Sequence, residues 1–220
     1  MQSKSNFKNC LLYVITDEKL GQERSHYEIA KLAIAGGADI IQLRDKSAPG
    51  KKMYEDAVKI RKLTGETGTI FIVNDRVDIA LASDADGVHV GQNDLPASII
   101  RKLIGDDKIL GVSAESVDDA VRAKQDGADY LGVGPVYEAR GSKPDTSAPW
   151  GLRLLKDVRA AVDLPIVAIG GIKYENAAEV IRAGAHCVSV ISAVVSASDI
   201  RKATADLRQL IENERSRRDG

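Results

Sequence analysis

The stretch IVAIGGIKYENAAEVIRAGAHCVSVISA, residues 166–193, contains one complete strand–helix–strand unit. Its first part, Ile166–Ile169, is short, apolar and rich in β-branched residues, as buried strands are. After a glycine pair, Tyr174–Arg182 has the apolar spacing of a helix. Gly184 suits the left-handed cap that ends many helices, and the apolar run Cys187–Ile191 begins soon after it. This order predicts two parallel strands joined through a helix.

The same unit repeats along the whole chain. Helix-to-strand joints with one shared pattern, a glycine followed by a small residue and the next strand, lie at residues 35–39, 125–129 and 182–186. Eight apolar runs have the length and composition of buried strands: Leu11–Thr16, Ile40–Leu43, Ile70–Asn74, Gly87–Val90, Ile109–Ser113, Tyr130–Gly134, Ile166–Ile169 and Cys187–Ile191. Eight further stretches have helical spacing: Tyr27–Ala35, Lys51–Leu63, Arg76–Ala82, Pro96–Ile104, Val117–Gln125, Trp150–Ala161, Tyr174–Arg182 and Ile200–Ile211.

Strict alternation of strands and helices predicts a single-domain α/β protein, a (β/α)8 TIM barrel. The strands are too apolar to have one face in water, which indicates a parallel sheet covered by helices. An open doubly wound sheet is the alternative, but the first strand lacks the G-x-G-x-x-G turn of such sheets. In this interpretation residues 1–10 are an N-terminal extension, residues 11–214 form the barrel, and residues 215–220 are a disordered tail.

The overall composition argues against several classes of partner. Hydrophobic residues make up 44% and charged residues 29%, the ordinary balance of a soluble globular protein. A formal charge of -1 gives no global attraction to nucleic acid or to an anionic membrane. No apolar run approaches the ~20 residues of a membrane span, and no signal peptide is recognisable. We therefore expect a cytoplasmic protein with reduced Cys10 and Cys187 and small-molecule substrates; association into a homo-oligomer stays open.

A cationic group follows the second predicted strand. In a TIM barrel the reacting groups lie at the carboxyl ends of the strands, and Gln42, Arg44 and Lys46 occupy such a position. Strand alternation sends these three side chains to the same side. Arginine offers a planar fork of donors and lysine a mobile positive charge, so they predict a site for a diphosphate. The alternative is a solvated loop in which Arg44 pairs with Asp45.

Two carboxylates follow the next two strands. Asp75 comes directly after Asn74 at the end of the third strand, and Asp94 follows the fourth strand. Carboxylates from neighbouring strands with an amide beside them resemble a magnesium site, where the ion keeps several waters and binds phosphate oxygens of the substrate. Each aspartate could instead cap the helix that follows it. Because Arg44 and Lys46 belong to the same edge, we favour the metal site.

The fifth and sixth strands add a hydroxyl and a long loop. Ser113 ends the fifth strand, where its hydroxyl could donate to a phosphate or only cap the next turn. The sixth strand continues into a long polar loop, residues 134–145, in a chain whose other connections are short. Loops of this length often close over reactive intermediates, and Lys143 within it could reach an anion at the barrel mouth.

The seventh and eighth strands end in a pattern typical of phosphate-binding barrels. Gly170 and Gly171 follow the seventh strand, while Ile191, Ser192 and Ala193 begin a helical turn after the eighth. Bare glycine amides and the first amides of a helical turn bind a phosphate without any net charge. Glycines that serve packing alone are the alternative. The pattern predicts phosphate binding and leaves the reaction type open.

Nucleophilic catalysis by the protein has little support in the sequence. His89 lies inside an apolar strand, where a histidine is more often a satisfied core or mouth residue than a ligand, and His26 and His186 lie at element boundaries. Neither a Ser-His-Asp arrangement nor a zinc-ligand spacing stands out. Aromatic residues are only 4% of the chain, which argues against base stacking with nucleic acid.

Taken together, these residues match a known family. From Leu12 to the last helix the chain resembles the thiamine-phosphate synthases. The motifs that carry the resemblance are Gln42-Leu43-Arg44-Asp45-Lys46, Asn74-Asp75, Gly87-Val88-His89-Val90-Gly91-Gln92-Asn93-Asp94, Gly132-Val133-Gly134-Pro135-Val136-Tyr137, Ser142-Lys143, Gly170-Gly171-Ile172 and Val190-Ile191-Ser192. The resemblance implies a transferase of thiamine biosynthesis that joins hydroxymethylpyrimidine diphosphate to hydroxyethylthiazole phosphate and releases pyrophosphate with the help of Mg2+.

The resemblance also implies a role for each site residue. Asp75 and Asp94 would hold Mg2+. The residues that would surround the pyrimidine diphosphate are Gln42, Arg44, Lys46, Asn74, Ser113 and Lys143, of which Arg44, Ser113 and Lys143 are the expected catalytic residues. Gly171, Ile191 and Ser192 would offer backbone donors to the thiazole phosphate, with Ser142 nearby.

One segment departs from the family pattern. Where the family has Pro-Thr after the aromatic residue of Gly-Pro-Val-Tyr, this chain has Glu138 and Ala139, and the loop to Ser142 is one residue longer. A threonine hydroxyl near the thiazole phosphate would then be missing. Two alternatives therefore stay open: a related barrel that acts as a thiazole tautomerase, and a catalytically silent phosphate-binding regulator.

Overall fold

Eight short buried strands form the centre of the molecule in the computed structural model, which describes residue 4, residues 7–138 and residues 151–219. The strands are β1 Leu12–Thr16, β2 Ile40–Leu43, β3 Ile70–Asn74, β4 Gly87–Val90, β5 Ile109–Ala114, β6 Tyr130–Val133, β7 Ile166–Ala168 and β8 Cys187–Val190. They pair in parallel in chain order, and β8 pairs with β1 to close the barrel. The predicted barrel is confirmed, and each strand ends within one residue of its predicted bounds.

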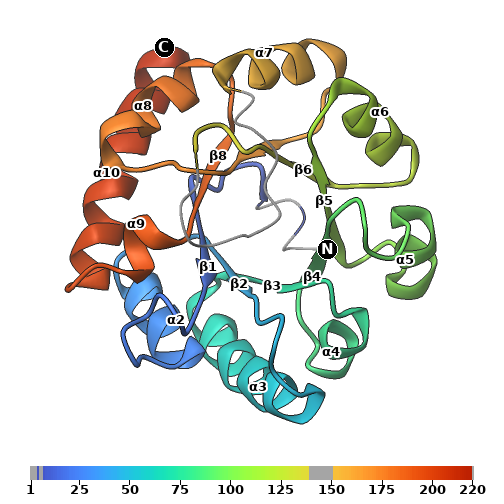
Figure 1. Ribbon diagram of the computed structural model, residues 1–220, viewed down its shortest axis with the longest axis vertical. Coiled ribbons are helices and arrows are strands. Elements are labelled where there is room, and N and C mark those ends of the chain that lie inside the picture. The colour runs from blue at the N-terminus through green and yellow to red at the C-terminus, as the bar shows by residue number, and fades with distance from the viewer. Residues whose placement is uncertain (1–3, 5–6, 139–150, 220) are drawn as a thin grey trace.

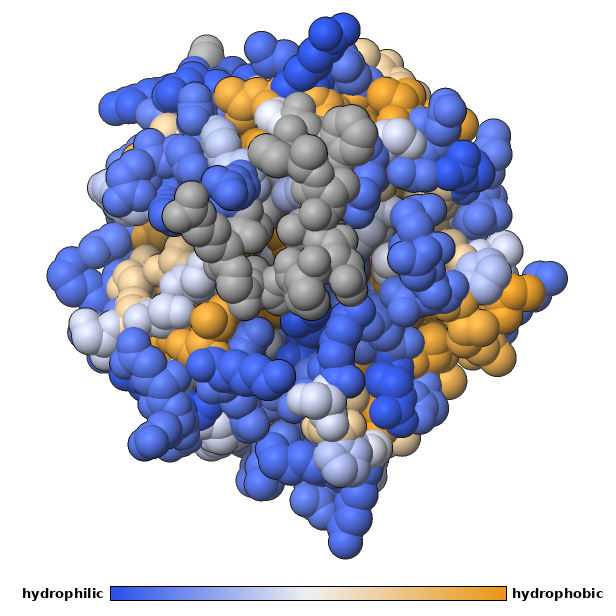
Figure 2. All heavy atoms as spheres, in the orientation of Figure 1, coloured by the Kyte–Doolittle hydropathy of each residue, from blue (hydrophilic) through white to orange (hydrophobic). Residues whose placement is uncertain are grey.

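Helices surround the barrel (Figure 1). They are α2 His26–Ala35, α3 Gly50–Thr67, α4 Val77–Ala82, α5 Ala97–Ile104, α6 Val117–Gln125, α7 Gly151–Ala161, α8 Tyr174–Arg182, α9 Ser192–Val195 and α10 Ile200–Asp219. Apolar residues of the strands and of the inward helix faces form one core. A hydrophobic area lies over α5 (Figure 2), where Leu95, Ile99 and Leu103 are exposed. Among the helices in the described ranges, none combines the length and apolar character that a bilayer span requires.

The helix bounds differ most from the sequence prediction in α3 and α10. The helix α3 continues past the predicted end at Leu63 to Thr67, where Gly68 takes a left-handed conformation with φ 72° and ends it. The hydroxyls of Thr64 and Thr67 donate to carbonyls one turn back, so both find a partner within the helix. Threonine and glycine have weak helix propensity, so the sequence pattern ended too early.

The predicted disordered tail was wrong for residues 215–219, which continue α10. Arg215 donates to the backbone carbonyls of Lys8 and Cys10, and Arg218 to those of Ile181 and Ala185. These carbonyl contacts fix the last turns of the helix against the barrel. A run of arginines suggests a solvated segment because the sequence does not show the backbone acceptors that bind it.

The described part of the N-terminal extension packs against the start of β6. The ring of Phe7 stacks on that of Tyr130 with centroids 4.4 Å apart, and Lys4 forms an ion pair with Asp129 at 3.0 Å. Since Tyr130 is the first residue of β6, these contacts lie at the amino end of the strands. The opposite end of the barrel is left for the site.

A chain of polar side chains crosses the inside of the barrel. The hydroxyls of Tyr13 and Tyr130 lie 3.0 Å apart, Gln42 Nε2 donates to Tyr13 at 2.6 Å, and His89 joins Tyr130 to Ser113 at 2.9 and 3.0 Å. Space for the Tyr130 ring depends on Gly111, because a Cβ there would lie 2.1 Å from the ring carbon Cζ. Satisfied networks of this kind rigidify a core. This network supports the residues above it at the carboxyl ends of the strands.

Candidate active site

A cavity of about 590 Å3 opens at the carboxyl ends of the strands. All eight strands contribute side chains or backbone to its lining. Every site residue predicted from the sequence within the described ranges lines this one cavity: Gln42, Arg44, Lys46, Asn74, Asp75, Asp94, Ser113, Gly171, Ile191 and Ser192. Ser142 and Lys143 lie outside the described residues. The cationic, acidic and glycine-rich groups therefore share a single mouth.

Two aspartates face each other at one side of the cavity. Burial and the neighbouring carboxylate of Asp94 raise the pKa of Asp75 to about 6, although Lys46 and Arg44 act in the opposite direction. Lys46 Nζ lies 3.7 Å from Asp75 Oδ2. Two like charges held together in a partly buried place destabilise each other, and a cation between them relieves this repulsion. The pair therefore fits a divalent metal ion.

Neither aspartate acts as a helix cap. The N-cap of α4 is Arg76 and that of α5 is Pro96, and neither position makes a side-chain cap hydrogen bond. Asp94 Oδ2 instead accepts from the amide of Gly91 at 2.7 Å. Asp75 has φ 59°, a left-handed conformation that is costly for a residue with a Cβ. Strain of this kind is often found at functional sites, and the capping alternative for both residues is wrong.

Asp45, which lies between Arg44 and Lys46, holds the loop after β2 in place. Asp45 Oδ1 accepts from the amides of Ser47 and Ala48 at 2.8 and 2.9 Å, and from the Ser47 hydroxyl at 3.0 Å. Partial burial alone would raise the pKa of Asp45, but these hydrogen bonds outweigh it and hold that pKa at about 2. Asp45 thus fixes the loop rather than neutralising Arg44. Within the described ranges, the guanidinium of Arg44 has no hydrogen-bond or ion-pair partner.

The floor of the cavity consists of the polar side chains inside the barrel. Gln42 and Ser113 stand at the two ends of the Tyr13–Tyr130–His89 network. The prediction that His89 is a satisfied mouth residue is confirmed. Tyr13 and Tyr130 also line the cavity, and the sequence prediction missed them because tyrosines in apolar strands resemble ordinary core residues.

Ser189 is a second residue that the sequence prediction missed. Its side chain on β8 is 3% exposed and lines the cavity, and its Oγ has no hydrogen-bond partner among the described residues. A buried hydroxyl without a partner costs free energy unless a ligand or water binds it. The sequence offers one indication that Ser189 belongs to the site. It lies two residues before Ile191, and strand alternation sends these two side chains to the same side.

A niche for a phosphate lies at the other side of the cavity, formed by Gly171, Ile191 and Ser192. Gly170 and Gly171 have φ 100° and 62°, and a Cβ at either position would lie within 2.6 Å of the segment 135–138. These two conformations and the close approach require glycine. The predicted helical turn after β8 is confirmed as α9, with Ile191 as its N-cap. Its first amides have no acceptor within the helix and are available to an anion.

Comparison with known proteins agrees with this arrangement. Residues 12–194 match the family model described as thiamine monophosphate synthase. The chain belongs to the thiamine monophosphate synthase family. It is 53% identical over 200 residues to the thiamine-phosphate synthase of Chloroflexus aurantiacus, a match that covers 91% of this chain and 92% of that one. It is also 53% identical over 206 residues to the thiamine-phosphate synthase of Moorella thermoacetica, with 94% and 98% covered.

The thiamine phosphate pyrophosphorylase of Pyrococcus furiosus has a similar structure. It superposes with a TM-score of 0.88 at 42% identity, covering 95% of this chain and 99% of that chain. The predicted family, the TIM barrel and the assignment as a transferase enzyme of thiamine biosynthesis are confirmed. Neither the thiazole tautomerase nor the silent regulator is supported by these relatives.

Proposed function

We propose that the chain joins hydroxymethylpyrimidine diphosphate to hydroxyethylthiazole phosphate in the cavity at the carboxyl ends of the strands. The observation that carries the proposal is the shared mouth. One cavity is lined by Arg44, Lys46 and the Asp75–Asp94 pair on one side and by the niche at Gly171 and Ser192 on the other. A diphosphate and a second phosphate can thus be bound at the same time, which a transfer between two phosphorylated substrates requires.

Asp75 and Asp94 would hold Mg2+. The donor set fits, because carboxylate oxygens are the ligands that Mg2+ prefers, and burial together with the carboxylate of Asp94 raises the pKa of Asp75, a destabilisation that a divalent cation relieves. Bound there, Mg2+ supplies positive charge for the departing pyrophosphate. Lys46 lies beside the same pair and adds a cation at its edge.

The side chains of the cavity would stabilise the leaving group and place the substrates. Arg44 donates from a planar fork that suits two phosphate oxygens, while Gln42, Asn74 and Ser113 offer polar contacts to the pyrimidine diphosphate. Lys143 and Ser142 belong to this proposal through the family resemblance alone. As pyrophosphate leaves, the pyrimidine ring stabilises its own cation, so the protein mainly neutralises charge, excludes water and orients the incoming nitrogen.

The thiazole phosphate would bind at the niche. The amides of Gly171 and Ser192 and the N-terminus of α9 offer donors there without net charge. Ser189, whose hydroxyl on the floor has no hydrogen-bond partner in the described part of the chain, is a further donor for a substrate oxygen or nitrogen. The departure at Glu138 changes the rim of the same cavity, which Glu138 lines.

The direct test is turnover of both substrates. Purified protein with the two substrates and Mg2+ should release one pyrophosphate for each thiamine phosphate formed, detected by coupled phosphate release and by chromatography. A chelator should abolish both products. Turnover that is unaffected by a chelator, or a lack of thiamine phosphate across a range of Mg2+ concentrations, would count decisively against the proposal.

We also propose a cytoplasmic location. Cys10 and Cys187 are buried and neither forms a disulfide, which supports a reducing compartment. Association of the chain into a homo-oligomer stays a prediction.

The affinity for Mg2+ should fall as the pH falls through 6. The pKa of Asp75 is raised to about 6 in the folded chain, above the value of about 3.8 expected after unfolding. Protonated Asp75 therefore favours the folded state below this range, and that contribution is lost as the pH rises through 6. Mg2+ has to displace this proton at low pH, so its apparent affinity at pH 5 should be about tenfold weaker than at pH 8.

Thermal unfolding with and without Mg2+ measures this effect. The rise in Tm at a fixed Mg2+ concentration should be larger at pH 8 than at pH 5, and Asp75→Asn should remove the difference. Equal Mg2+-induced shifts at both pH values would show that Asp75 does not bind the ion.

A further inference from the structure

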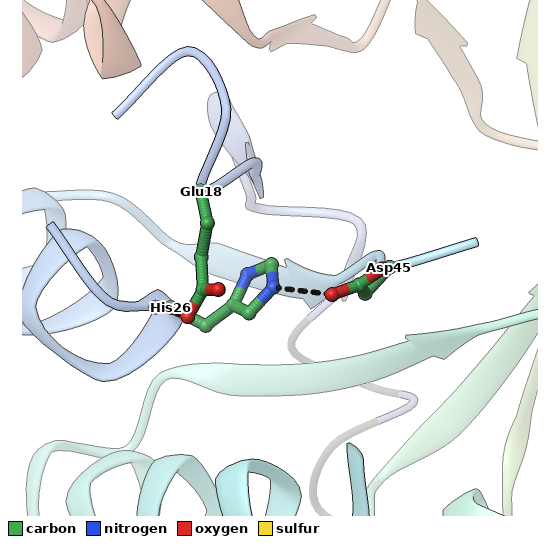
Figure 3. Close-up of side chains that lie close together, drawn as sticks. All are labelled: Glu18, His26 and Asp45. Atoms are coloured by element: carbon green, nitrogen blue, oxygen red, sulfur yellow. Dashed lines mark hydrogen bonds and ion pairs between the residues drawn. The ribbon is translucent and has the colours of Figure 1, made fainter. Parts of the chain in front are cut away.

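Three potential metal ligands lie together outside the active-site cavity. Glu18 follows β1, His26 begins α2, and Asp45 follows β2. One ligand atom of each lies within 4.8 Å of the others. Figure 3 shows the imidazole of His26 between the carboxylates of Glu18 and Asp45. None of the three lines the cavity, so the cluster is separate from the Asp75–Asp94 pair.

The ring nitrogen Nε2 of His26 faces a hydrogen-bond acceptor. His26 Nδ1 lies 2.7 Å from Thr16 Oγ1, which donates its own proton to the carbonyl of Gln42. In a neutral imidazole Nδ1 is then the donor to Thr16, and Nε2 offers a lone pair. Nε2 faces Asp45 Oδ2, a carboxylate oxygen that is also an acceptor. Two acceptors that face each other in a mostly buried place repel each other unless a proton or a metal cation lies between them.

The distance between the two atoms also fits a shared metal ion. His26 Nε2 and Asp45 Oδ2 are 3.5 Å apart, whereas a charge-assisted hydrogen bond to a carboxylate is typically about 2.7–2.9 Å long. Two ligand atoms at about 2.0–2.2 Å from a tetrahedral zinc ion are separated by roughly 3.3–3.5 Å. The Thr16 contact supplies the outer hydrogen bond that usually orients a metal-binding histidine.

We propose that Glu18, His26 and Asp45 bind a divalent transition-metal ion of the zinc class. A neutral imidazole with two carboxylates suits Zn2+ or Co2+, whereas Mg2+ prefers oxygen ligands alone. His26 is 2% exposed, Asp45 18% and Glu18 36%, so the site opens to solvent on the Glu18 side, where water completes the coordination. Lys52 Nζ lies 3.4 Å from Glu18 Oε1 and competes with the ion for that carboxylate.

The position of the site gives the ion a structural role next to the diphosphate site. Asp45 stands between Arg44 and Lys46, and its carboxylate lies beside His26 at the start of α2. A bound ion would therefore fix the loop after β2 to the loop after β1 and hold the two cations in place. Metal binding itself does not depend on the proposed reaction and can be measured without substrates.

Titration with Co2+ tests the proposal directly. The chain is first stripped with a chelator and then kept in excess Mg2+, so that the Asp75–Asp94 pair is occupied. One equivalent of Co2+ should produce visible d–d absorption, and Zn2+ should displace it. His26→Gln and Asp45→Asn should weaken binding at least ~100-fold, because loss of a direct ligand costs no less than loss of an outer contact. Lys52→Gln should tighten it roughly fivefold, the scale of an exposed ion pair.

His186→Gln is the matched control, since His186 contacts Arg159 and the amide of Ile166 at the far end of the barrel. It should bind Co2+ like the parent chain. If His26→Gln does not fold by circular dichroism, the partly exposed Glu18→Gln carries the test with an expected loss of about tenfold or more. Binding that survives in all three ligand variants, or that disappears in Asp75→Asn, would overturn the proposal. The absence of any Co2+ absorption would also overturn the proposal.

Discussion

Asp75→Asn is expected to lower kcat/KM for thiamine phosphate formation at least ~100-fold, the scale of losing a principal electrostatic group of the transition state. Asp75 shares the cavity with Asp94, and burial and the carboxylate of Asp94 both raise its pKa. Asparagine keeps a similar shape and tolerates the left-handed φ of 59°, so the backbone has no reason to move. The expected loss of activity therefore comes from the loss of charge at Asp75. Steady-state kinetics over a series of Mg2+ concentrations measures it.

The thermal stability of Asp75→Asn should not fall, although its activity does. Above pH 6 the substitution removes a like-charge contact, so the Tm without Mg2+ should stay the same or rise. Asp78→Asn is the matched control, because Asp78 lies three residues further on, pairs with Arg76 at the surface and does not line the cavity. Its turnover should be close to that of the parent chain. Near-normal turnover of Asp75→Asn would remove Asp75 from the mechanism.

The barrel could be predicted from the sequence because its signals are local and repeated. Each strand is an apolar run of three to six residues, and joints such as Gly36 and Gly184 mark where the next strand follows. The site could be predicted for a related reason. All carboxyl ends of parallel strands meet at one edge, so polar residues placed there, such as Arg44 and Asp75, had to lie together once the barrel was given.

Contacts between distant segments could not be predicted in this way. Tyr13 and Tyr130 are far apart in sequence, and only the closed barrel brings their hydroxyls to 3.0 Å. The helical structure of residues 215–219 depends on hydrogen bonds to the backbone carbonyls of Lys8 and Ile181. No pattern in residues 215–219 themselves reveals these acceptors. The histidine at position 26 lay at an element boundary, and its relation to Asp45 exists only because β1 and β2 are neighbours.

Arg44→Gln is expected to lower kcat/KM roughly 30- to 150-fold, which corresponds to the ~2–3 kcal/mol of charged hydrogen bonds to a phosphate. Part of this loss should appear in kcat, because negative charge on the pyrophosphate grows as it leaves and the contact strengthens in the transition state. Arg44→Lys should recover only part of the activity, since it restores the charge without the planar fork. Arg76→Gln is the control, because Arg76 pairs with Asp78 outside the cavity and should be dispensable for turnover. A change confined to KM in Arg44→Gln, with kcat intact, would mean that Arg44 binds the diphosphate equally before and during its departure, and the role in stabilising the leaving group would have to pass to Lys46 or Lys143.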